Sequence, residues 1–186
     1  HLRWPGFRKV RRQVYKRVDR RLHDLGLADL TEYSAYLEAH PEEWHVLDAA
    51  CRIPISRFYR DRGVFQFLER QAIPDLAEQA VACGEEELRC WSLGCAAGEE
   101  PYTLAILWKL ALQARFPTLS LRVLATDVDP EAIARAARAC YSPSSLKELP
   151  AEWRAQALTP SAAGWCVNAE YREAVCFELQ DIRATA

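Results

Sequence analysis

Residues 88–103 read LRCWSLGCAAGEEPYT, a short apolar run that ends in a turn with two glycines and continues into a sequence able to form a helix. A second apolar run follows over 121–126, and another helical stretch is expected over 130–140. The order strand, helix, strand, helix is typical of a parallel sheet with helices packed on it. The sequence therefore predicts an α/β domain with a right-handed crossover.

The turn after the first run has the composition of a ligand site. Gly94 and Gly98, with small residues such as Ala96 between them, let a ligand approach the backbone closely, and the first N–H groups of the next helix point into the same space. Glu99 and Glu100 lie where a pyrophosphate would rest in a dinucleotide fold, and they would repel it. The turn therefore favours a cationic ligand, although two-glycine turns also occur in many α/β folds without this role.

A carboxylate at the end of the second run points to the same kind of ligand. Asp127 is well placed to accept hydrogen bonds from two ribose hydroxyls. S-adenosylmethionine has a ribose, an ammonium and a sulfonium but no phosphate, so it suits this turn better than NAD does. Cys95 has no neighbours with metal-ligand spacing, and we expect it to be a spacer and the site to hold no metal.

The first 50 residues have a different pattern. Apolar residues recur every three or four positions over 7–25, which predicts an amphipathic helix. Asp29 and Glu32 resemble a capping box at the start of a second helix, and Pro41 fits the first turn of a third. Residues 1–50 are therefore predicted to form a small all-helical domain.

The first helix is strongly basic. Residues 1–30 contain nine Lys and Arg against three Asp, whereas the whole chain has a formal net charge of −2. One interpretation is a solvated face, but rows of like charge repel one another and favour an acidic partner that would use them. The candidate surface comprises Arg8, Arg12, Lys16, Arg17 and Arg20.

Length and composition exclude several classes of protein. The chain has 186 residues, of which 50% are hydrophobic and 27% charged, as in an ordinary globular protein. Its apolar stretches are too short to span a bilayer, and its start lacks the order of a signal peptide. Seven cysteines without C-x-x-C pairs predict reduced thiols and a cytoplasmic protein. The absence of Met and the start at His1 suggest a piece of a longer chain.

Three motifs occur in order along the chain: SRFYRD at 56–61, GEEPYT at 98–103 and ATDVDP at 125–130. Together they resemble the CheR family of chemotaxis methyltransferases, and the resemblance extends over about residues 6–183. It implies a small helical domain followed by a Rossmann-like domain. It also implies an enzyme that transfers the methyl group of S-adenosylmethionine to glutamate side chains of chemoreceptors, with S-adenosylhomocysteine as the second product.

The resemblance suggests a division of the chain. Residues 1–50 would be the helical domain, 51–83 a linker and joining helix, and 84–186 the Rossmann-like domain, with a small β-hairpin subdomain near 160–178. The family continues with further strands, so the sheet is expected to be incomplete here.

The same resemblance assigns roles to individual residues. Ser56 and Arg60 would touch the cofactor, Glu99 its methionine or sugar portion, and Asp127 its ribose. Arg60 is the candidate catalytic residue, because its planar fork can hold a carboxylate through two hydrogen bonds. The full predicted cofactor set is Ser56, Arg60, Gly94, Ala96, Gly98, Glu99, Asp127, Asp181 and Ile182, the last two at the adenine.

Simpler interpretations of these residues remain open. Ser56 could cap the next helix, Arg60 could pair with Asp61 or Glu69 at the surface, and Asp181 could merely end a strand. Pro54 departs from the family, which commonly has Asn at this position. The change removes a side-chain amide and a backbone donor, so cofactor affinity or substrate could differ.

For the basic helix, the resemblance implies docking on the acidic methylation helices of a receptor's cytoplasmic domain. Two alternatives are an RNA or other-substrate methyltransferase that uses this helix, and a non-catalytic regulatory domain that binds S-adenosylmethionine. The rest of the chain is acidic and no platform of aromatic and basic residues flanks the turn, so we expect no nucleic acid partner.

Overall fold

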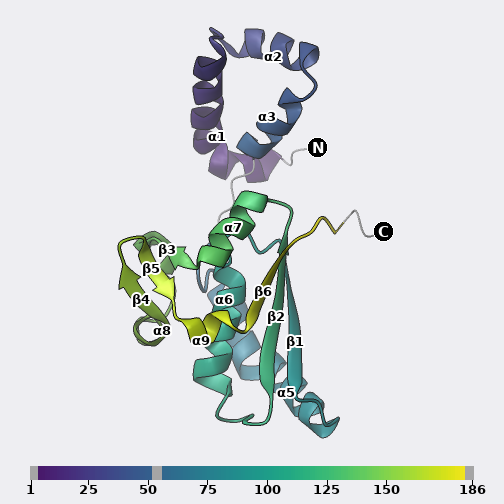
Figure 1. The fold of residues 1–186 in the computed structure, drawn as a ribbon, viewed down its shortest axis with the longest axis vertical. Coiled ribbons are helices and arrows are strands. Elements are labelled where there is room, and N and C mark those ends of the chain that lie inside the picture. The colour runs from purple at the N-terminus through teal and green to yellow at the C-terminus, as the bar shows by residue number, and fades with distance from the viewer. Residues whose placement is uncertain (1–3, 52–55, 183–186) are drawn as a thin grey trace. The chain divides into compact units, whose positions relative to one another are not determined.

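The computed structural model describes residues 4–51 and 56–182, with side chains from Arg11 onward, as two compact units, His1–Ile55 and Ser56–Ala186 (Figure 1). The first unit is all-helical, as predicted, and the second contains a parallel sheet with helices, so the chain has the predicted α/β class. No helix in the described parts is long and apolar enough to cross a membrane.

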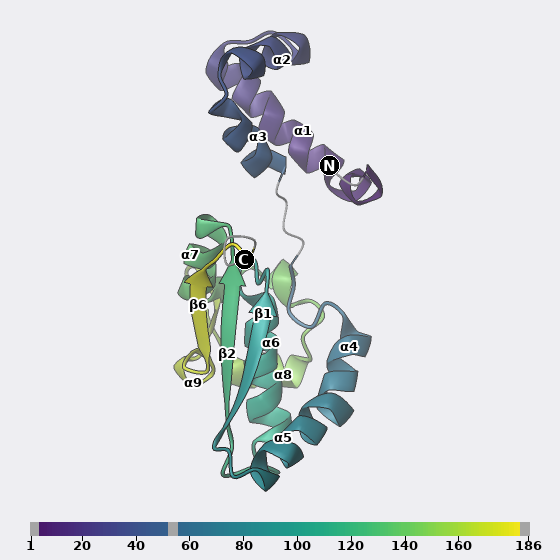
Figure 2. The same ribbon diagram turned by 90° about the vertical axis from the view of Figure 1, so that its right-hand side faces the viewer.

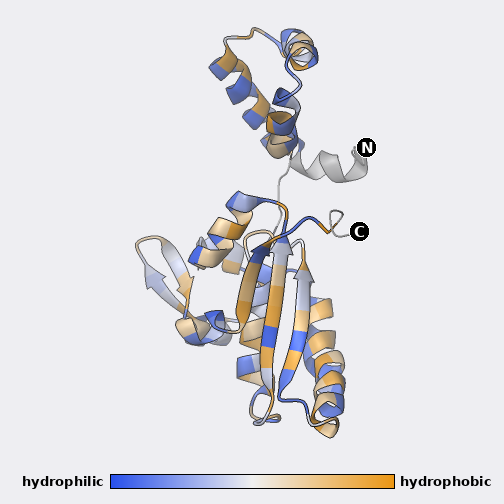
Figure 3. Cartoon of the chain, turned by 45° about the vertical axis from the view of Figure 1, so that its right-hand side comes forward, coloured by the Kyte–Doolittle hydropathy of each residue, from blue (hydrophilic) through white to orange (hydrophobic). Residues whose placement is uncertain are grey.

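Three helices build the first unit: α1 (Trp4–Leu25), α2 (Leu30–Ala39) and α3 (Glu43–Cys51). Hydrophobic and hydrophilic segments alternate along the described part of α1 in Figure 3, as expected for an amphipathic helix with one apolar stripe. Its apolar stripe contributes Val14 and Val18 to a small core, where they pack with Tyr33 and Leu37 of α2.

The start of α2 has a variant of the predicted capping box, in which Asp29 caps the helix but Glu32 accepts the N–H of Ala28 and not that of Asp29. The Asp29 carboxylate accepts hydrogen bonds from the N–H groups of Thr31 (2.7 Å) and Glu32 (3.0 Å), and these lower the pKa of Asp29. In return, Glu32 accepts the N–H of Ala28 at 2.7 Å. The helix therefore begins where the sequence indicated, because the signal lies within four residues of chain.

Part of the basic face of α1 turns towards α3, which the sequence did not show. The Arg21 guanidinium donates two hydrogen bonds to the buried Glu43 carboxylate, at 2.8 and 2.7 Å, and the Tyr33 hydroxyl donates a third at 3.0 Å. The hydrogen bonds from Arg21 lower the pKa of Glu43, whereas burial and then the Glu43 carboxylate raise the pKa of Tyr33 to about 12. Arg21 is therefore a partner of Glu43 within the first unit, and the interpretation of the basic residues as a solvated face does not hold for it.

The second unit begins with a helical run along the β1 side of the sheet (Figure 2). It consists of α4 (Arg62–Phe67), a π-helical turn η1 (Leu68–Ala72) and α5 (Ile73–Ala82). Pro74 is the second residue of α5 and follows directly after the π-helical turn. The run belongs to the second unit, whereas the sequence suggested a joining segment over 51–83.

A three-stranded parallel sheet in the order β1–β2–β6 forms the centre of this unit. Helix α6 (Glu99–Leu107), extended by the π-helical turn η2 (Trp108–Leu112), connects β1 to β2, and α7 (Pro130–Arg138) follows β2. Both helices pack against the sheet, as the predicted order of elements requires. The strands are β1 (Glu87–Leu93), β2 (Ser120–Asp127) and β6 (Val175–Leu179).

A small antiparallel sheet in the order β3–β5–β4 lies apart from the parallel one (Figure 1). Its hairpin spans 158–167, so only part of the expected 160–178 range belongs to it. Helix α9 then returns the chain to β2, and β6 joins the parallel sheet. The elements of this region are β3 (Cys140–Tyr141), η3 (Pro143–Leu146), α8 (Ala151–Ala157), β4 (Leu158–Ser161), β5 (Gly164–Val167) and α9 (Ala169–Arg172).

A disulfide joins Cys140 of β3 to Cys166 of β5. The expectation of reduced thiols throughout is therefore wrong for this pair. The two cysteines are 26 positions apart in the sequence, and antiparallel pairing places them directly opposite each other. Sequence spacing carries no sign of this register.

Candidate active site

The glycine turn is tied to the end of β2. The N–H groups of Gly94 and Cys95 both donate to the carbonyl of Thr126, at 2.8 and 3.0 Å. Gly98 has a φ of +91°, and a Cβ there would lie 3.0 Å from both the Ala136 Cβ and the Tyr141 hydroxyl. Only glycine fits at this position, because both the conformation and the close packing exclude a side chain.

Asp127, the predicted ribose ligand, also organises the turn. One of its carboxylate oxygens accepts the N–H of Ala96 at 2.8 Å, and the other accepts the N–H of Asp129 at 3.0 Å. A carboxylate has about four acceptor positions, so Asp127 retains capacity for ribose hydroxyls. The side chain therefore links the two strand ends and still offers acceptors to a ligand.

A cavity of about 260 Å³ opens at the carboxyl ends of β1, β2 and β6. This edge is where ligands bind in parallel α/β sheets. Its wall is mainly apolar, and Asp127 is the one carboxylate among the described residues that line it, which suits a nucleoside. The cavity is lined by Leu93, Gly94, Thr126, Asp127, Val128, Gln180 and Ile182.

Glu99 is buried with an unused acceptor. Its side chain is 5% exposed, and its Oε2 atom has no hydrogen-bond partner among the described residues. By contrast, Glu100 is exposed and accepts a hydrogen bond from Ser92 at 2.7 Å. An unpartnered buried carboxylate is costly, so Glu99 fits a ligand that brings a cation or a hydroxyl to it.

The structure brings the 56–61 segment to the start of α6. The N–H of Tyr59 donates to the Thr103 hydroxyl at 3.2 Å, and this hydroxyl donates to the carbonyl of Glu99 at 2.6 Å. Two motifs are thus joined through one side chain, by a hydrogen bond between residues 44 positions apart. Ser56 is half-buried and does not cap α4, whose N-cap position is occupied by Asp61.

Arg60, the candidate catalytic residue, is about half exposed and forms an ion pair with Asp61 at 3.2 Å. This is the surface pairing that the sequence left open. Of the predicted cofactor residues, Gly94, Asp127 and Ile182 line the 260 Å³ cavity. The others are not among its lining residues, namely Ser56, Arg60, Ala96, Gly98, Glu99 and Asp181. Pro54, the departure from the family, lies outside the described residues.

Cys95 lies in the turn as a buried thiol. Burial, followed by the Asp127 carboxylate, raises its pKa to about 12, so the thiol stays protonated at neutral pH. Among the described residues, no group of three or more His, Cys, Asp or Glu is arranged to hold a metal ion.

Two family models match the chain. The model described as "CheR methyltransferase, SAM binding domain" covers residues 55–186, and the one described as "CheR methyltransferase, all-alpha domain" covers 9–47. The chain belongs to the CheR methyltransferase family. The resemblance inferred from the three motifs is thereby confirmed.

Curated relatives include chemotaxis protein methyltransferases. Those of Listeria innocua and Salmonella typhimurium are 34% and 36% identical over 130 and 141 residues, covering 70% and 75% of this chain and 47% and 45% of the relative. An uncharacterised 104.1 kDa protein of Rhodobacter capsulatus is 34% identical over 171 residues, or 91% of this chain and 18% of that protein. The chain spans less than half the length of these relatives.

The all-alpha CheR domain carries the predicted basic surface on α1. Arg12, Lys16 and Arg20 are exposed. Arg17 is also exposed but donates to two carbonyl groups in the last turn of α3, at 3.3 and 3.4 Å. Arg8 lies in α1, and its side chain is outside the described part of the structure.

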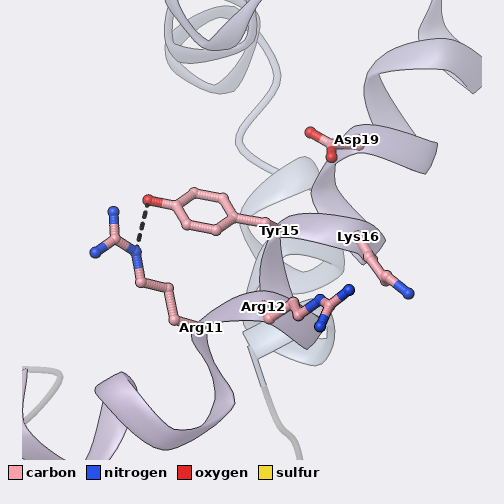
Figure 4. Close-up of a pocket in the computed structure, with 5 residues that line it drawn as sticks. All are labelled: Arg11, Arg12, Tyr15, Lys16 and Asp19. Atoms are coloured by element: carbon pink, nitrogen blue, oxygen red, sulfur yellow. Dashed lines mark hydrogen bonds between the residues drawn. The ribbon is translucent and has the colours of Figure 1, made fainter.

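A shallow hollow of about 510 Å³ lies on this surface (Figure 4). Arg11 donates to the Tyr15 hydroxyl at 3.2 Å, and its guanidinium lies 5.1 Å from the Tyr15 ring centre. Arg12 and Lys16 extend from the same stretch of α1, and Asp19 is the single acid among the described residues that line the hollow. Arg11 and Tyr15 were not singled out from the sequence, although their i, i+4 spacing could have indicated the pair.

Other residues of the candidate site were also missed. Thr126 and Gln180 line the cavity beside the predicted Asp127 and Ile182, and their position at strand ends was the available signal. The role of Thr103 could not be predicted from its neighbours in the sequence, because it depends on the hydrogen bond from the N–H of Tyr59 in a distant segment.

Proposed function

We propose that this chain is part of an S-adenosylmethionine-dependent methyltransferase that forms methyl esters on glutamate side chains of chemoreceptors. The observation that carries the proposal is the buried Glu99 carboxylate, whose Oε2 is unpartnered among the described residues, in a turn held by Asp127. Membership of the CheR family and the names of the chemotaxis methyltransferase relatives support it.

The residues of the site suit S-adenosylmethionine in three places. Asp127 has acceptors for the ribose hydroxyls, and Val128 and Ile182 offer apolar walls for the adenine. Glu99 would accept from the ammonium of the methionine portion. When bound, the cofactor supplies an electrophilic methyl group on its sulfonium.

The substrate carboxylate needs no general base, because a glutamate with a reference pKa near 4.3 is already ionised at neutral pH. The work left to the protein is alignment and exclusion of water. The planar guanidinium of Arg60 can bind a carboxylate through two hydrogen bonds, and in the structure it already pairs with the carboxylate of Asp61. Arg60 would therefore orient the substrate glutamate or the carboxylate of the cofactor.

The basic surface of α1 supports a protein substrate. Arg11, Arg12, Lys16 and Arg20 are exposed on one helix, and their summed field attracts an acidic partner. We propose that this surface docks on the acidic methylation helices in the cytoplasmic part of a chemoreceptor.

Methyl transfer from labelled S-adenosylmethionine to a panel of receptor cytoplasmic fragments tests this function. Label that mild base releases as methanol identifies an ester, which distinguishes it from methylation of RNA or of nitrogen. Arg60→Ala should lower the rate by at least about 100-fold, the scale of a lost transition-state contact. The matched control is Arg57→Ala, three residues earlier, where an exposed arginine pairs with Glu148 at 3.4 Å, and we expect its rate to be unchanged.

Three results would contradict the proposal. Base-stable label would identify a different reaction, and equal rates for Arg60→Ala and the wild-type chain would remove Arg60 from it. Cofactor binding without transfer to any fragment would favour a regulatory domain.

A further inference from the structure

The side chain of Tyr141 reaches the cofactor turn from the small sheet. Its hydroxyl donates to the carbonyl of Ala97 at 2.7 Å, and the ring is 5% exposed. The same hydroxyl would lie 3.0 Å from a Cβ at Gly98, so the turn packs directly on it. The rings of Phe58 and Tyr141 pack edge to face, with centres 4.8 Å apart and planes at 85°. Tyr141 thus contacts the turn at two consecutive residues.

Strand β3, which carries Tyr141, consists of only two residues, and the other one is Cys140. Pairing with β5 sets Cys140 opposite Cys166 and Tyr141 opposite Trp165. The disulfide therefore joins β3 covalently to β5 at the residue immediately before Tyr141. A covalent bond at this point restricts how far the Tyr141 backbone, and with it the hydroxyl, can move.

The backbones of β3 and β5 also approach each other closely. Gly164 at the start of β5 has a φ of +118°, and a Cβ there would lie 2.4 Å from the carbonyl oxygen of Tyr141. A side chain at position 164 is excluded, so the close approach of the two strands restricts the position of the Tyr141 backbone. The disulfide and the glycine thus act on the same two-residue strand.

We propose that Tyr141 is a positioning residue for the cofactor turn and that the Cys140–Cys166 disulfide holds it in place. The inference rests on the proposed function, because the turn binds a cofactor only if that function is correct. With the disulfide formed, Tyr141 holds Ala97 and the turn is ordered for its ligand. After reduction only the backbone pairing holds β3 to β5, so the contact with Ala97 weakens and cofactor affinity falls.

Reduction here is thiol–disulfide exchange with a dithiol such as dithiothreitol. The S–S bond breaks, two electrons and two protons pass to Cys140 and Cys166, and the reductant closes to its own cyclic disulfide. Tyr141 takes no part in the exchange and serves only as the connection between the disulfide and the turn.

Two measurements on the full chain test the positioning role. Hydrogen exchange of the backbone amides over 94–99 without ligand reports order in the turn, and calorimetry reports affinity for S-adenosylmethionine. Tyr141→Phe removes only the hydroxyl, and we expect faster exchange of these amides and affinity about fivefold lower, the effect of one lost hydrogen bond.

Tyr102→Phe is the matched control. Tyr102 is as well buried as Tyr141, and its hydroxyl donates to the carbonyl of Ala136 in α7, at 3.2 Å, and not to the turn. This variant loses a comparable buried hydrogen bond, and we expect it to leave both measurements unchanged.

The role of the disulfide is tested by the same two measurements, hydrogen exchange over 94–99 and calorimetry, with and without dithiothreitol. Reduction should speed exchange over 94–99 and weaken binding in the wild-type chain. The double variant Cys140→Ser/Cys166→Ser should reproduce the reduced state and ignore the reductant. A second double variant, Cys83→Ser/Cys176→Ser, removes two exposed free thiols and should respond as the wild-type chain does.

The proposal is wrong if the two tyrosine variants change turn exchange equally, or if reduction leaves it unchanged. It fails as well if the Cys83→Ser/Cys176→Ser variant loses the response, because another thiol would then be responsible. If exchange over 94–99 responds as expected while the wild-type chain does not bind S-adenosylmethionine, the positioning role stands and the proposed function fails.

Discussion

The carboxylate of Asp127 accepts a hydrogen bond from the backbone N–H of Ala96 at 2.8 Å, so the end of β2 holds the turn that follows β1. The same carboxylate lines the cavity at the strand ends. One side chain therefore shapes the turn and offers acceptors to a ligand.

Replacing this carboxylate should affect binding more than folding. Asp127→Asn turns one acceptor oxygen into an NH₂ donor, which leaves the N–H of Ala96 or of Asp129 without its acceptor and removes the charge offered to ribose hydroxyls. We expect affinity for S-adenosylmethionine, measured by calorimetry, to fall at least about tenfold, since hydrogen bonds to charged groups contribute about 1.5–3 kcal/mol.

Asp129→Asn is the control for that experiment. Asp129 caps α7 by accepting from the N–H groups of Glu131 and Ala132, and asparagine caps equally well. Affinity should stay within about twofold of the wild-type value, because this change costs well under 1 kcal/mol. Equal losses in the two variants would argue against a specific role for Asp127.

Glu99 should show opposite effects on stability and on binding. Glu99→Gln keeps the shape but removes a buried charge whose Oε2 is unpartnered among the described residues, so the free energy of unfolding should stay equal or rise. Affinity for S-adenosylmethionine should fall by about tenfold or more, because a charge-assisted hydrogen bond is lost. Thermal unfolding and calorimetry measure the two quantities.

Glu100→Gln is the neighbouring control, since Glu100 is exposed and bonded to Ser92. Its affinity should match the wild-type value. A Glu99→Gln variant that binds S-adenosylmethionine normally would show that the buried carboxylate serves another purpose.

Charge reversal on α1 should slow methylation of a receptor fragment. Arg12→Glu/Lys16→Glu replaces two exposed cations at the hollow with anions, and we expect kcat/KM to fall about tenfold or more at low ionic strength. The difference should shrink as salt is raised, because the Debye length shortens to about 8 Å at 0.15 M.

The matched variant, Arg70→Glu/Lys109→Glu, reverses two exposed charges in the other unit and should leave kcat/KM unchanged. Equal rates for the α1 variant and the wild-type chain at all salt concentrations would eliminate the docking surface.

The Arg21–Glu43 pair should make the first unit sensitive to acid. The pKa of Glu43 is lowered in the folded state, from a reference of 4.5, mainly by its hydrogen bonds with Arg21. A lowered carboxyl pKa adds stability that is fully present above the unfolded value and is lost as pH falls through the folded one. Urea denaturation followed through NMR signals of Val18 and Leu37 should therefore show stability falling below about pH 4.5.

Glu43→Gln should flatten this dependence, whereas Glu42→Gln, at an exposed neighbour, should retain it. An unchanged pH profile in Glu43→Gln would mean that another group titrates.

Much of the fold was predictable because its signals are local. The capping residues Asp29 and Glu32 act within one helical turn, and the strand, glycine turn and helix over 88–107 follow from neighbouring residues. The cavity residue Asp127 was predictable too, since the carboxyl ends of parallel strands meet at one edge of the sheet, whereas Ile182 was predicted from the family resemblance alone.

Contacts between distant segments were not predictable in this way. Arg21 pairs with Glu43 only because α3 packs against α1, and Cys140 bonds to Cys166 only because β5 pairs with β3. Each partner lies more than 20 positions away, and periodicity within one element says nothing about which other element will pack against it.

By itself, the sequence determined that an acidic glycine turn follows a strand and precedes a helix, because composition and periodicity act over a few residues. Only the tertiary structure decided which of the two glutamates of that turn is buried with an unused acceptor. Glu100 is exposed and accepts a hydrogen bond from Ser92 of β1, whereas the packing of α6 buries Glu99 with its Oε2 unpartnered among the described residues. Burial and partner choice arise only when separate elements close around a side chain, and so they are properties of the folded chain.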